Sequence, residues 1–201
     1  MSDIREDSLY DDWDDFWDRE DNVTLLGKIM TKVRMQAYRD ALAKLEIKTA
    51  LDVGCGTGLV LEIFSKLGYE CEGIDVSKNS VTICQKKGMN ARVALLEEME
   101  GSYDLVESEG MLEHFLHFEP YATHMMRLSK RYVMIMQPNH GSFWGRTLVY
   151  AAQLLRSNVL MFEYNYRMSD FIDVFDKHGF RNIISEPVFF NTSRLLVFEK
   201  K

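Results

Sequence analysis

Residues 51–58, with the sequence LDVGCGTG, form the stretch whose residue types and spacing most clearly indicate chemistry. An apolar run typical of a buried strand leads directly into three glycines, which permit a tight turn and a close approach of the backbone to a ligand. A helical pattern follows, and the first amides of that helix point toward whatever lies at the turn. This arrangement is typical of a loop that binds a nucleotide-type cofactor.

Asp75 ends the next predicted strand, 21 positions after Gly54, where a carboxylate meets the two hydroxyls of a ribose. The spacing of the glycines then separates two cofactor classes. A dinucleotide loop has the pattern GxGxxG and admits a pyrophosphate, whereas Gly54, Gly56 and Gly58 are spaced two and two. Asp52 precedes them, and a carboxylate there repels pyrophosphate and suits a ligand that bears a cation. The pattern therefore disfavours a nicotinamide-dependent oxidoreductase.

The elements that must position these residues alternate along the chain between short β-rich runs and helical stretches. Such alternation is typical of right-handed βαβ units and of a parallel sheet covered on both faces, so the expected class is α/β. The predicted strands are 50–53, 71–75, 91–95, 103–106 and 132–136, and the predicted helices between them are 60–66, 81–86 and 120–128.

Both ends of the chain depart from this alternation. Apolar residues at steps of three or four predict a long amphipathic helix from about Asn22, and aromatic residues between positions 10 and 17 also have helical spacing. Near the other end, a helix is expected over 169–177, with Ser169 as its N-cap and Gly179 just after its end. The runs 183–190 and 195–198 are so close in sequence that they predict an antiparallel hairpin.

The charge and cysteine patterns exclude several function classes. The net charge is −7, but residues 3–21 alone carry ten acids and two arginines, which leaves +1 for the rest of the chain. No basic stripe is available, so nucleic acid and anionic membrane are poor partners. The three cysteines have no CxxC spacing, which favours reduced thiols over a disulfide framework or a zinc site. With no signal peptide or transmembrane pattern, we expect a soluble, cytoplasmic protein.

The sequence resembles the class I S-adenosylmethionine-dependent methyltransferases, and within them the type 11 small-molecule enzymes. Residues 51–58 resemble the first motif of the family, 73–77 the end of its second strand, 103–106 its fourth strand, and 111–114 (MLEH) the segment that follows. The likeness covers roughly residues 49–139, and the terminal hairpin fits the antiparallel seventh strand of the family.

This resemblance implies a doubly wound, Rossmann-like sheet of seven strands in the order 3-2-1-4-5-7-6, with strand 7 antiparallel. We expect a helical cap over residues 1–46, followed by a methyltransferase domain over 47–201 in which 140–168 form a lid-like insertion. The cofactor is then S-adenosyl-L-methionine. Its amino acid part is expected at Asp52 and the loop glycines, and its ribose at Asp75. The remaining expected cofactor-binding residues are Cys55 within the loop, Val76, Leu95 and Leu96 around the adenine, and Glu107 near the sulfonium.

Residues that act on the methyl acceptor are less clearly marked, because the cofactor already carries an activated methyl group. His114 and His140 are the candidate catalytic residues, since an imidazole titrates near neutral pH. A capping or packing role for His114 is equally consistent with its position. Glu109, Glu113 and His114 are better explained as locally hydrogen-bonded groups than as metal ligands, so no metal is expected. The aromatic residues between 143 and 166 either line an acceptor pocket or form a lid.

The function that follows is transfer of a methyl group to an O, N or C atom of a small-molecule acceptor. Two alternatives stay open: a protein or nucleic-acid methyltransferase, and a catalytically inactive, cofactor-binding partner subunit that docks through its acidic N-terminal segment. Neither the acceptor nor the oligomeric state is written in the sequence.

Overall fold

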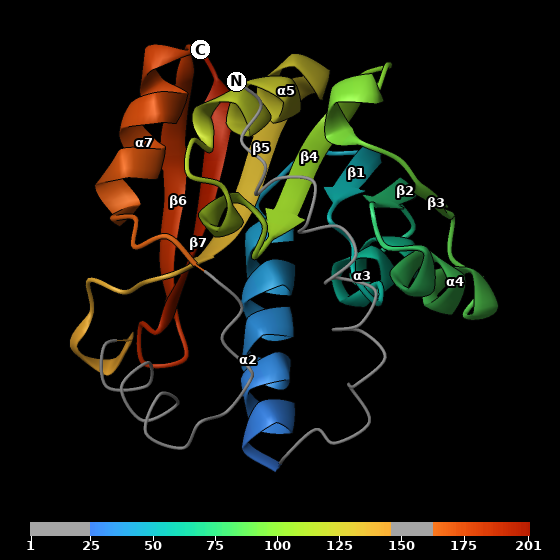
Figure 1. Ribbon diagram of the computed structural model, residues 1–201, viewed down its shortest axis with the longest axis horizontal. Coiled ribbons are helices and arrows are strands. Elements are labelled where there is room, and N and C mark those ends of the chain that lie inside the picture. The colour runs from blue at the N-terminus through green and yellow to red at the C-terminus, as the bar shows by residue number, and fades with distance from the viewer. Residues whose placement is uncertain (1–24, 146–162) are drawn as a thin grey trace.

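A computed structural model describes residues 25–145 and 163–201, and within them seven strands form one sheet in the order β3-β2-β1-β4-β5-β7-β6. Only β7 runs antiparallel, and it pairs with β5 on one side and β6 on the other (Figure 1). The strands are β1 (Thr49–Val53), β2 (Glu70–Asp75), β3 (Ala91–Val93), β4 (Tyr103–Glu109), β5 (Ser129–Pro138), β6 (Phe180–Val188) and β7 (Ser193–Lys200). The predicted strand order and the antiparallel hairpin are confirmed.

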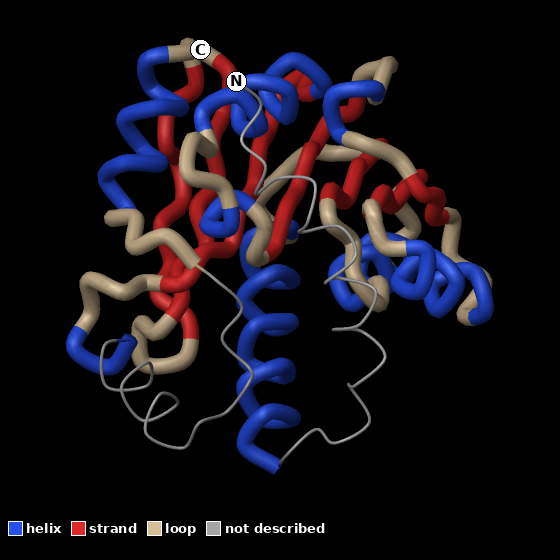
Figure 2. Tube along the Cα trace, viewed as in Figure 1, coloured by secondary structure: helices blue, strands red, loops and turns tan. Residues whose placement is uncertain are grey.

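Helices cover both faces of the sheet, as expected where the central strands are buried on both faces. The helices are α2 (Leu25–Leu42), α3 (Leu59–Lys66), α4 (Lys78–Lys86), α5 (Glu119–Leu128) and α7 (Met168–Lys177). Figure 2 shows how they alternate in sequence with the strands. One core cluster lies between the sheet and α5 and α7, and a second lies between the opposite face and α2 and α3. The site therefore rests on strands that are packed from both sides.

Helix α2 has a special position. Its C-terminal half packs on the sheet, where Tyr38, Ala41 and Leu42 are fully buried. Its N-terminal half extends past the carboxyl end of β4 (Figure 1), and there Ile29 is 45% exposed. One helix thus joins the core of the sheet to the space beyond its carboxyl edge.

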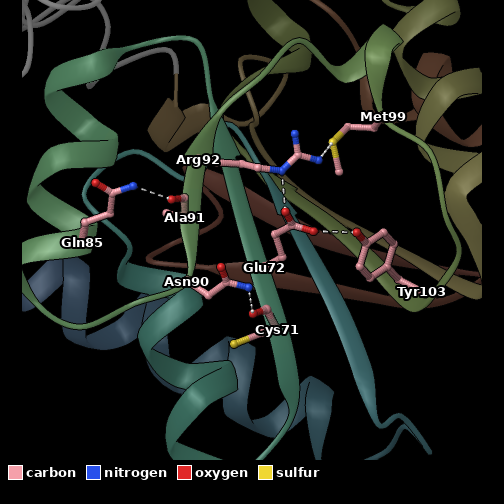
Figure 3. A network of polar contacts seen from close by, with 8 residues as sticks. All are labelled: Cys71, Glu72, Gln85, Asn90, Ala91, Arg92, Met99 and Tyr103. Atoms are coloured by element: carbon pink, nitrogen blue, oxygen red, sulfur yellow. Dashed lines mark hydrogen bonds and ion pairs between the residues drawn. The ribbon is translucent and has the colours of Figure 1, made fainter.

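A polar network links β2, β3 and β4 (Figure 3). Glu72 on β2 accepts a hydrogen bond from Arg92 Nε on β3 at 2.6 Å and another from the Tyr103 hydroxyl of β4 at 2.7 Å. Burial and the nearby Glu72 carboxylate raise the pKa of Tyr103 to about 12, which keeps its hydroxyl a donor. The carboxylate of Glu72 thereby links β2 to its neighbour β3 and also to β4, which lies on the other side of β1.

Some boundaries differ from the predicted ones. The third strand stops at Val93, because the chain turns into a short 3₁₀ segment at Leu96–Glu98. The expected N-cap role of Ser169 is wrong: α7 begins at Met168, and the Asp170 carboxylate accepts from the Arg167 amide at 2.8 Å. Gly179 does follow the end of α7 with a φ of 83°. The aromatic residues of 10–17 and most of the segment 140–168 lie outside the described residues.

Candidate functional site

The predicted site residues gather at the carboxyl edge of the sheet. Strands β1, β2, β4 and β5 are parallel, so their carboxyl ends lie at one edge. Asp75 is the last residue of β2, Asp52 is the last but one of β1, and Glu107 lies two residues before the end of β4. His114 and His140 follow β4 and β5. In an open α/β sheet this edge is where ligands bind, at the point where the strand order reverses.

The glycine loop leaves β1 in a conformation that glycine allows without strain. Gly54, Gly56 and Gly58 have φ values of 70°, 50° and 83°, in the left-handed region. At Gly58 there is also no room for a side chain, because a Cβ would lie 2.6 Å from Met89 Sδ and 2.9 Å from Cys84 Sγ. Glycine at this position is therefore required by the packing around the loop as well as by the backbone conformation.

Asp75 holds this loop against the start of α4. Its carboxylate accepts from the Gly56 amide at 2.8 Å and from the Ser77 amide at 2.8 Å. Ser77 in turn caps α4, because its hydroxyl accepts from the Ser80 amide at 3.1 Å. Each carboxylate oxygen has a second lone pair, so Asp75 can order the loop and still accept from a ribose hydroxyl.

Cys55 lies inside the loop and is buried beside Cys84. The Cys84 thiol donates to the Gly56 carbonyl at 3.2 Å. The hydrogen bond with Cys84 and burial raise the pKa of Cys55. A thiol that stays protonated is a poor nucleophile, so the Cys55 side chain is better explained by packing than by reactivity.

The buried carboxyls of Asp52 and Glu107 face each other across β1 and β4, where they are register partners. Asp52 is 2% exposed and Glu107 is fully buried. Burial raises the pKa of Asp52 to about 7, and burial together with the neighbouring Asp52 raises that of Glu107. Tyr38 of α2 donates its hydroxyl to Glu107 Oε1 at 2.6 Å.

A second contact between α2 and β4 lies one helical turn from the first. Arg34 forms an ion pair with Glu109 at 2.7 Å. Arg34 and Tyr38 are four residues apart on α2, and Glu107 and Glu109 are two residues apart on β4, so both pairs share one helix face and one sheet face. Neither Arg34 nor Tyr38 is predicted from the sequence as a site residue, because nothing local marks a contact between residues so far apart in the chain.

The expected adenine contacts are unequally placed. Val76 directly follows β2 and is half-buried, and Leu95 is half-buried as well. Leu96 belongs to the core cluster under α5 and is only 6% exposed. A ligand at this edge would therefore meet Val76 and Leu95 more readily than Leu96.

The two candidate histidines have different surroundings. His114 ends a short 3₁₀ turn, Leu112–His114, and its amide donates to the Met111 carbonyl at 3.1 Å. His140 Nε2 lies 3.1 Å from Glu163 Oε2, with both side chains largely buried at 14% and 21% exposure. Glu163 comes from the segment that leads into α7, and no local pattern predicts its pairing with His140.

Glu113 lies close to this group. The amide of Tyr164, the residue after Glu163, donates to the Glu113 carbonyl at 2.8 Å. Burial, with the nearby charges of Glu163 and Glu109, raises the pKa of Glu113 to about 8. Within 25–145 and 163–201, no three His, Cys, Asp or Glu side chains converge as ligands for a metal ion.

The buried carboxyl groups of Asp52 and Glu107 fit a ligand that carries a positive charge. Asp52 Oδ2 and Glu107 Oε2 are buried without a hydrogen-bond partner. Among the described residues, no lysine, arginine or histidine forms an ion pair with either carboxyl. Buried acids without a positive partner are costly unless a proton or a ligand supplies the charge.

Comparison with protein families identifies the chain. Residues 29–186 match the family model described as "Methyltransferase domain". The chain belongs to this family of S-adenosylmethionine-dependent methyltransferases. In this methyltransferase the matched segment begins on α2 and ends within β6, so it includes strands β1 to β5, the glycine loop and Tyr38 of α2.

Curated relatives of this methyltransferase include ubiquinone biosynthesis O-methyltransferases. That of Bordetella avium (strain 197N) is 30% identical over 109 residues, which cover 49% of this chain and 45% of the relative. That of Pseudomonas paraeruginosa (strain DSM 24068 / PA7) is 33% identical over 109 residues, with 49% and 46% covered. The match thus spans about half the length of these relatives.

Solved structures share the fold of this methyltransferase over nearly its whole length. The magnesium protoporphyrin IX methyltransferase of Synechocystis PCC 6803 with bound SAH has a TM-score of 0.79 at 19% identity, with 98% of this chain and 100% of that chain covered. A putative methyltransferase of Haloferax volcanii, solved with its Trm112 activator, has a TM-score of 0.69 at 13% identity, with 95% and 96% covered.

None of the helices in the described part of the chain is both long and apolar enough to cross a membrane.

Proposed function

We propose that this methyltransferase transfers the methyl group of S-adenosylmethionine to a small-molecule acceptor. The observation that supports a small acceptor most directly is the His140–Glu163 pair, which lies largely buried at the carboxyl edge. A half-enclosed polar pair suits a ligand that enters between elements of one domain. The relatives named for ubiquinone biosynthesis and magnesium protoporphyrin IX also act on small molecules by their names.

The cofactor-binding roles follow from the positions at the edge. Asp75 would bind the ribose, and Val76 and Leu95 would lie against the adenine. The amino acid part would lie over the glycine loop, with Asp52 and Glu107 supplying the negative charge that its positive groups need. When bound, S-adenosylmethionine supplies an activated methyl group, so the protein mainly aligns the acceptor and excludes water.

His140 is the better placed of the two candidate bases. Glu163 Oε2 lies 3.1 Å from its Nε2, so a carboxylate would face the imidazole when it accepts a proton from the acceptor. This role suits an acceptor that must lose a proton, such as a phenol or a protonated amine. His114 belongs to a tight turn, and we assign it a positioning role.

The proposed organisation follows the sequence expectations. We propose that residues 47–201 form the catalytic domain and residues 1–46 a cap of which α2 is the described part. The expected lid-like insertion, 140–168, lies mostly outside the described residues. We further propose that the protein acts in the cytoplasm.

The first test is calorimetric titration of the purified protein with S-adenosylmethionine, S-adenosylhomocysteine and NADH. We expect the two sulfur ligands to bind and NADH not to bind. Asp75→Ala should weaken their binding by about 1–3 kcal/mol, as for the loss of a charged hydrogen-bond partner. Asp176→Ala is a matched control, because Asp176 is an exposed acid paired only with Lys201 among the described residues.

The second test is turnover on a panel of phenols, carboxylic acids and amines, followed by the appearance of S-adenosylhomocysteine. With an active acceptor, His140→Gln should lower kcat about 100-fold or more. Binding of the cofactor without turnover on any acceptor, together with a stable partner in a pull-down, would instead favour an inactive partner subunit. Methyl transfer to protein or nucleic acid would favour the other alternative.

A further inference from the structure

The row of side chains that crosses the sheet at Asp52 places two acids side by side between uncharged neighbours. From β5 to β2 the register partners are Met134, Glu107, Asp52 and Gly73. Gly73 has no side chain, and Met134 is fully buried and apolar. The two carboxyls are therefore each other's nearest polar neighbours within the sheet.

The elements packed against the row add few charges. From α2, Tyr38 donates to Glu107, while Arg34 is ion-paired with Glu109, two residues further along β4. On α3, Glu62 and Lys66 pair with each other at the surface.

The remaining groups near the pair are negative or neutral. Asp75 on β2 already accepts from two backbone amides. The Leu61 amide of α3 lowers the pKa of Asp52, but less than burial raises it. The pair therefore has a hydroxyl donor, from Tyr38, and a backbone amide donor, from Leu61, but no cation of its own among the described residues.

Two carboxylates cannot hydrogen-bond to each other, because both accept and neither donates. Their unpartnered oxygens, Asp52 Oδ2 and Glu107 Oε2, are satisfied if one of the two groups carries a proton. Like charges this close in a low-dielectric site also disfavour double ionisation, as in other paired carboxyls. Burial and mutual repulsion raise the pKa of both groups in the same direction.

We propose that Asp52 and Glu107 hold one proton between them, that S-adenosylmethionine displaces this proton when it binds, and that S-adenosylhomocysteine leaves it in place. This inference rests on the proposed function, since it assumes that the methyl donor binds at this edge. At neutral pH the donor carries a carboxylate, an ammonium and a sulfonium, and its net charge is positive. The product has lost the sulfonium charge and is neutral overall.

The charges of the pair and of the ligand change together. The free pair with its proton has one negative charge; binding of the donor releases the proton to solvent, and two negative charges then face the ligand. After methyl transfer the ligand loses its sulfonium charge, and the pair takes a proton back from solvent. The pair thus distinguishes donor from product by charge, although the two ligands have nearly the same shape.

The decisive experiment counts protons during binding. Wild-type protein is titrated calorimetrically at pH 6.5 with each ligand, in two buffers of different ionisation enthalpy. We expect about one proton released for S-adenosylmethionine and about none for S-adenosylhomocysteine. Correspondingly, the affinity for the donor alone should rise about tenfold per pH unit until the free pair has lost its proton.

Variants assign the proton to this pair. Glu107→Gln keeps an oxygen that accepts from Tyr38 but removes the titrating group, so proton release and the pH slope should both fall to near zero. Glu186→Gln, at an acid whose side chain is 51% exposed and pairs with Lys44, should leave the proton count unchanged. Tyr38→Phe is a second variant in case the first does not fold. It should raise the pH at which the affinity for S-adenosylmethionine levels off.

The outcomes separate the two proposals. Equal proton release for both ligands, or none for the donor, overturns the inference while the proposed function stands. Proton release that persists undiminished in Glu107→Gln overturns the assignment to this pair. If neither sulfur ligand binds the folded protein, the proposed function fails and this inference fails with it.

Discussion

Tyr38 and Glu107 lie 69 residues apart in the chain and are joined by a hydrogen bond of 2.6 Å inside the core. The contact links α2 to the strand whose carboxyl end helps to form the site. Neither group is exposed to solvent, so the bond fixes where the Glu107 carboxyl points. The helix is thereby part of the site architecture as well as of the core.

Removal of the Tyr38 hydroxyl should be costly. In Tyr38→Phe the buried Glu107 carboxyl loses its donor, and we expect the free energy of unfolding to fall by about 1–3 kcal/mol. Urea denaturation at pH 7 measures the change. Tyr69→Phe is the matched control, because within the described part of the chain the Tyr69 hydroxyl makes no hydrogen bond, and its effect should stay within about 0.5 kcal/mol. Equal effects of the two changes would contradict the prediction.

The stability of the ligand-free protein should decrease as the pH rises from 5.5 to 8.5. Burial raises the pKa of Asp52 to about 7 and that of Glu113 to about 8. The folded state therefore binds more protons than the unfolded state over this range, and stability present below the unfolded pKa is lost as pH passes the folded pKa.

Each of these two groups should contribute about 1–3 kcal/mol to that loss. Asp104 and Glu199, whose pKa values are lowered, act in the opposite direction only at more acidic pH. Glu113→Gln should flatten part of the slope in urea titrations at several pH values. A stability that stays constant or rises over the range would show that these carboxyls are ionised in the folded protein.

A side chain at Gly58 should be tolerated worse than one at Gly68. Both residues have left-handed backbones, with φ values of 83° and 80°, so alanine costs about 1–2 kcal/mol of strain at either. Only at Gly58 does the new Cβ collide, with Met89 Sδ and Cys84 Sγ, while nothing lies within 4 Å of it at Gly68. Urea denaturation of Gly58→Ala and Gly68→Ala gives the comparison, and equal losses would rule out the collision.

Arg34 and Glu109 should stabilise the protein as a pair. Their side chains are 33% and 18% exposed, so solvent screens the pair only in part. Arg34→Met should lower the free energy of unfolding by about 1–2 kcal/mol, because Glu109 is left without its cation. In Arg34→Met/Glu109→Met much of that loss should return, and a double-mutant cycle measures the coupling. Strict additivity of the two changes would contradict it.

The residues that local sequence predicts well are those set by local rules. Alternating β-rich and helical runs located the strands to within a few residues, and glycine spacing marked the loop at Gly54, because such turns demand left-handed backbones. The order of the strands came from the resemblance, not from periodicity. Ser169 was misassigned because α7 already begins at Met168, where the Asp170 carboxylate accepts from the Arg167 amide that precedes the helix.

The contacts that local sequence does not predict all join distant segments. Tyr38 reaches Glu107, and Glu163 reaches His140, only after the sheet has formed. The pairing depends on helix rotation and on strand register, and no spacing rule connects such residues. The resemblance pointed to Glu107, but its partner on α2 is visible only in the fold.

The antiparallel direction of β7 also determines where the protein can be attached to a surface. Because that strand runs against its neighbours, Lys201 lies at the amino edge of the sheet, where its amide donates to the Gly179 carbonyl at 2.8 Å. Figure 1 shows this terminus at the opposite end of the sheet from α2. A sensor surface coupled through Lys201 would leave the glycine loop and its acids facing the flowing solution.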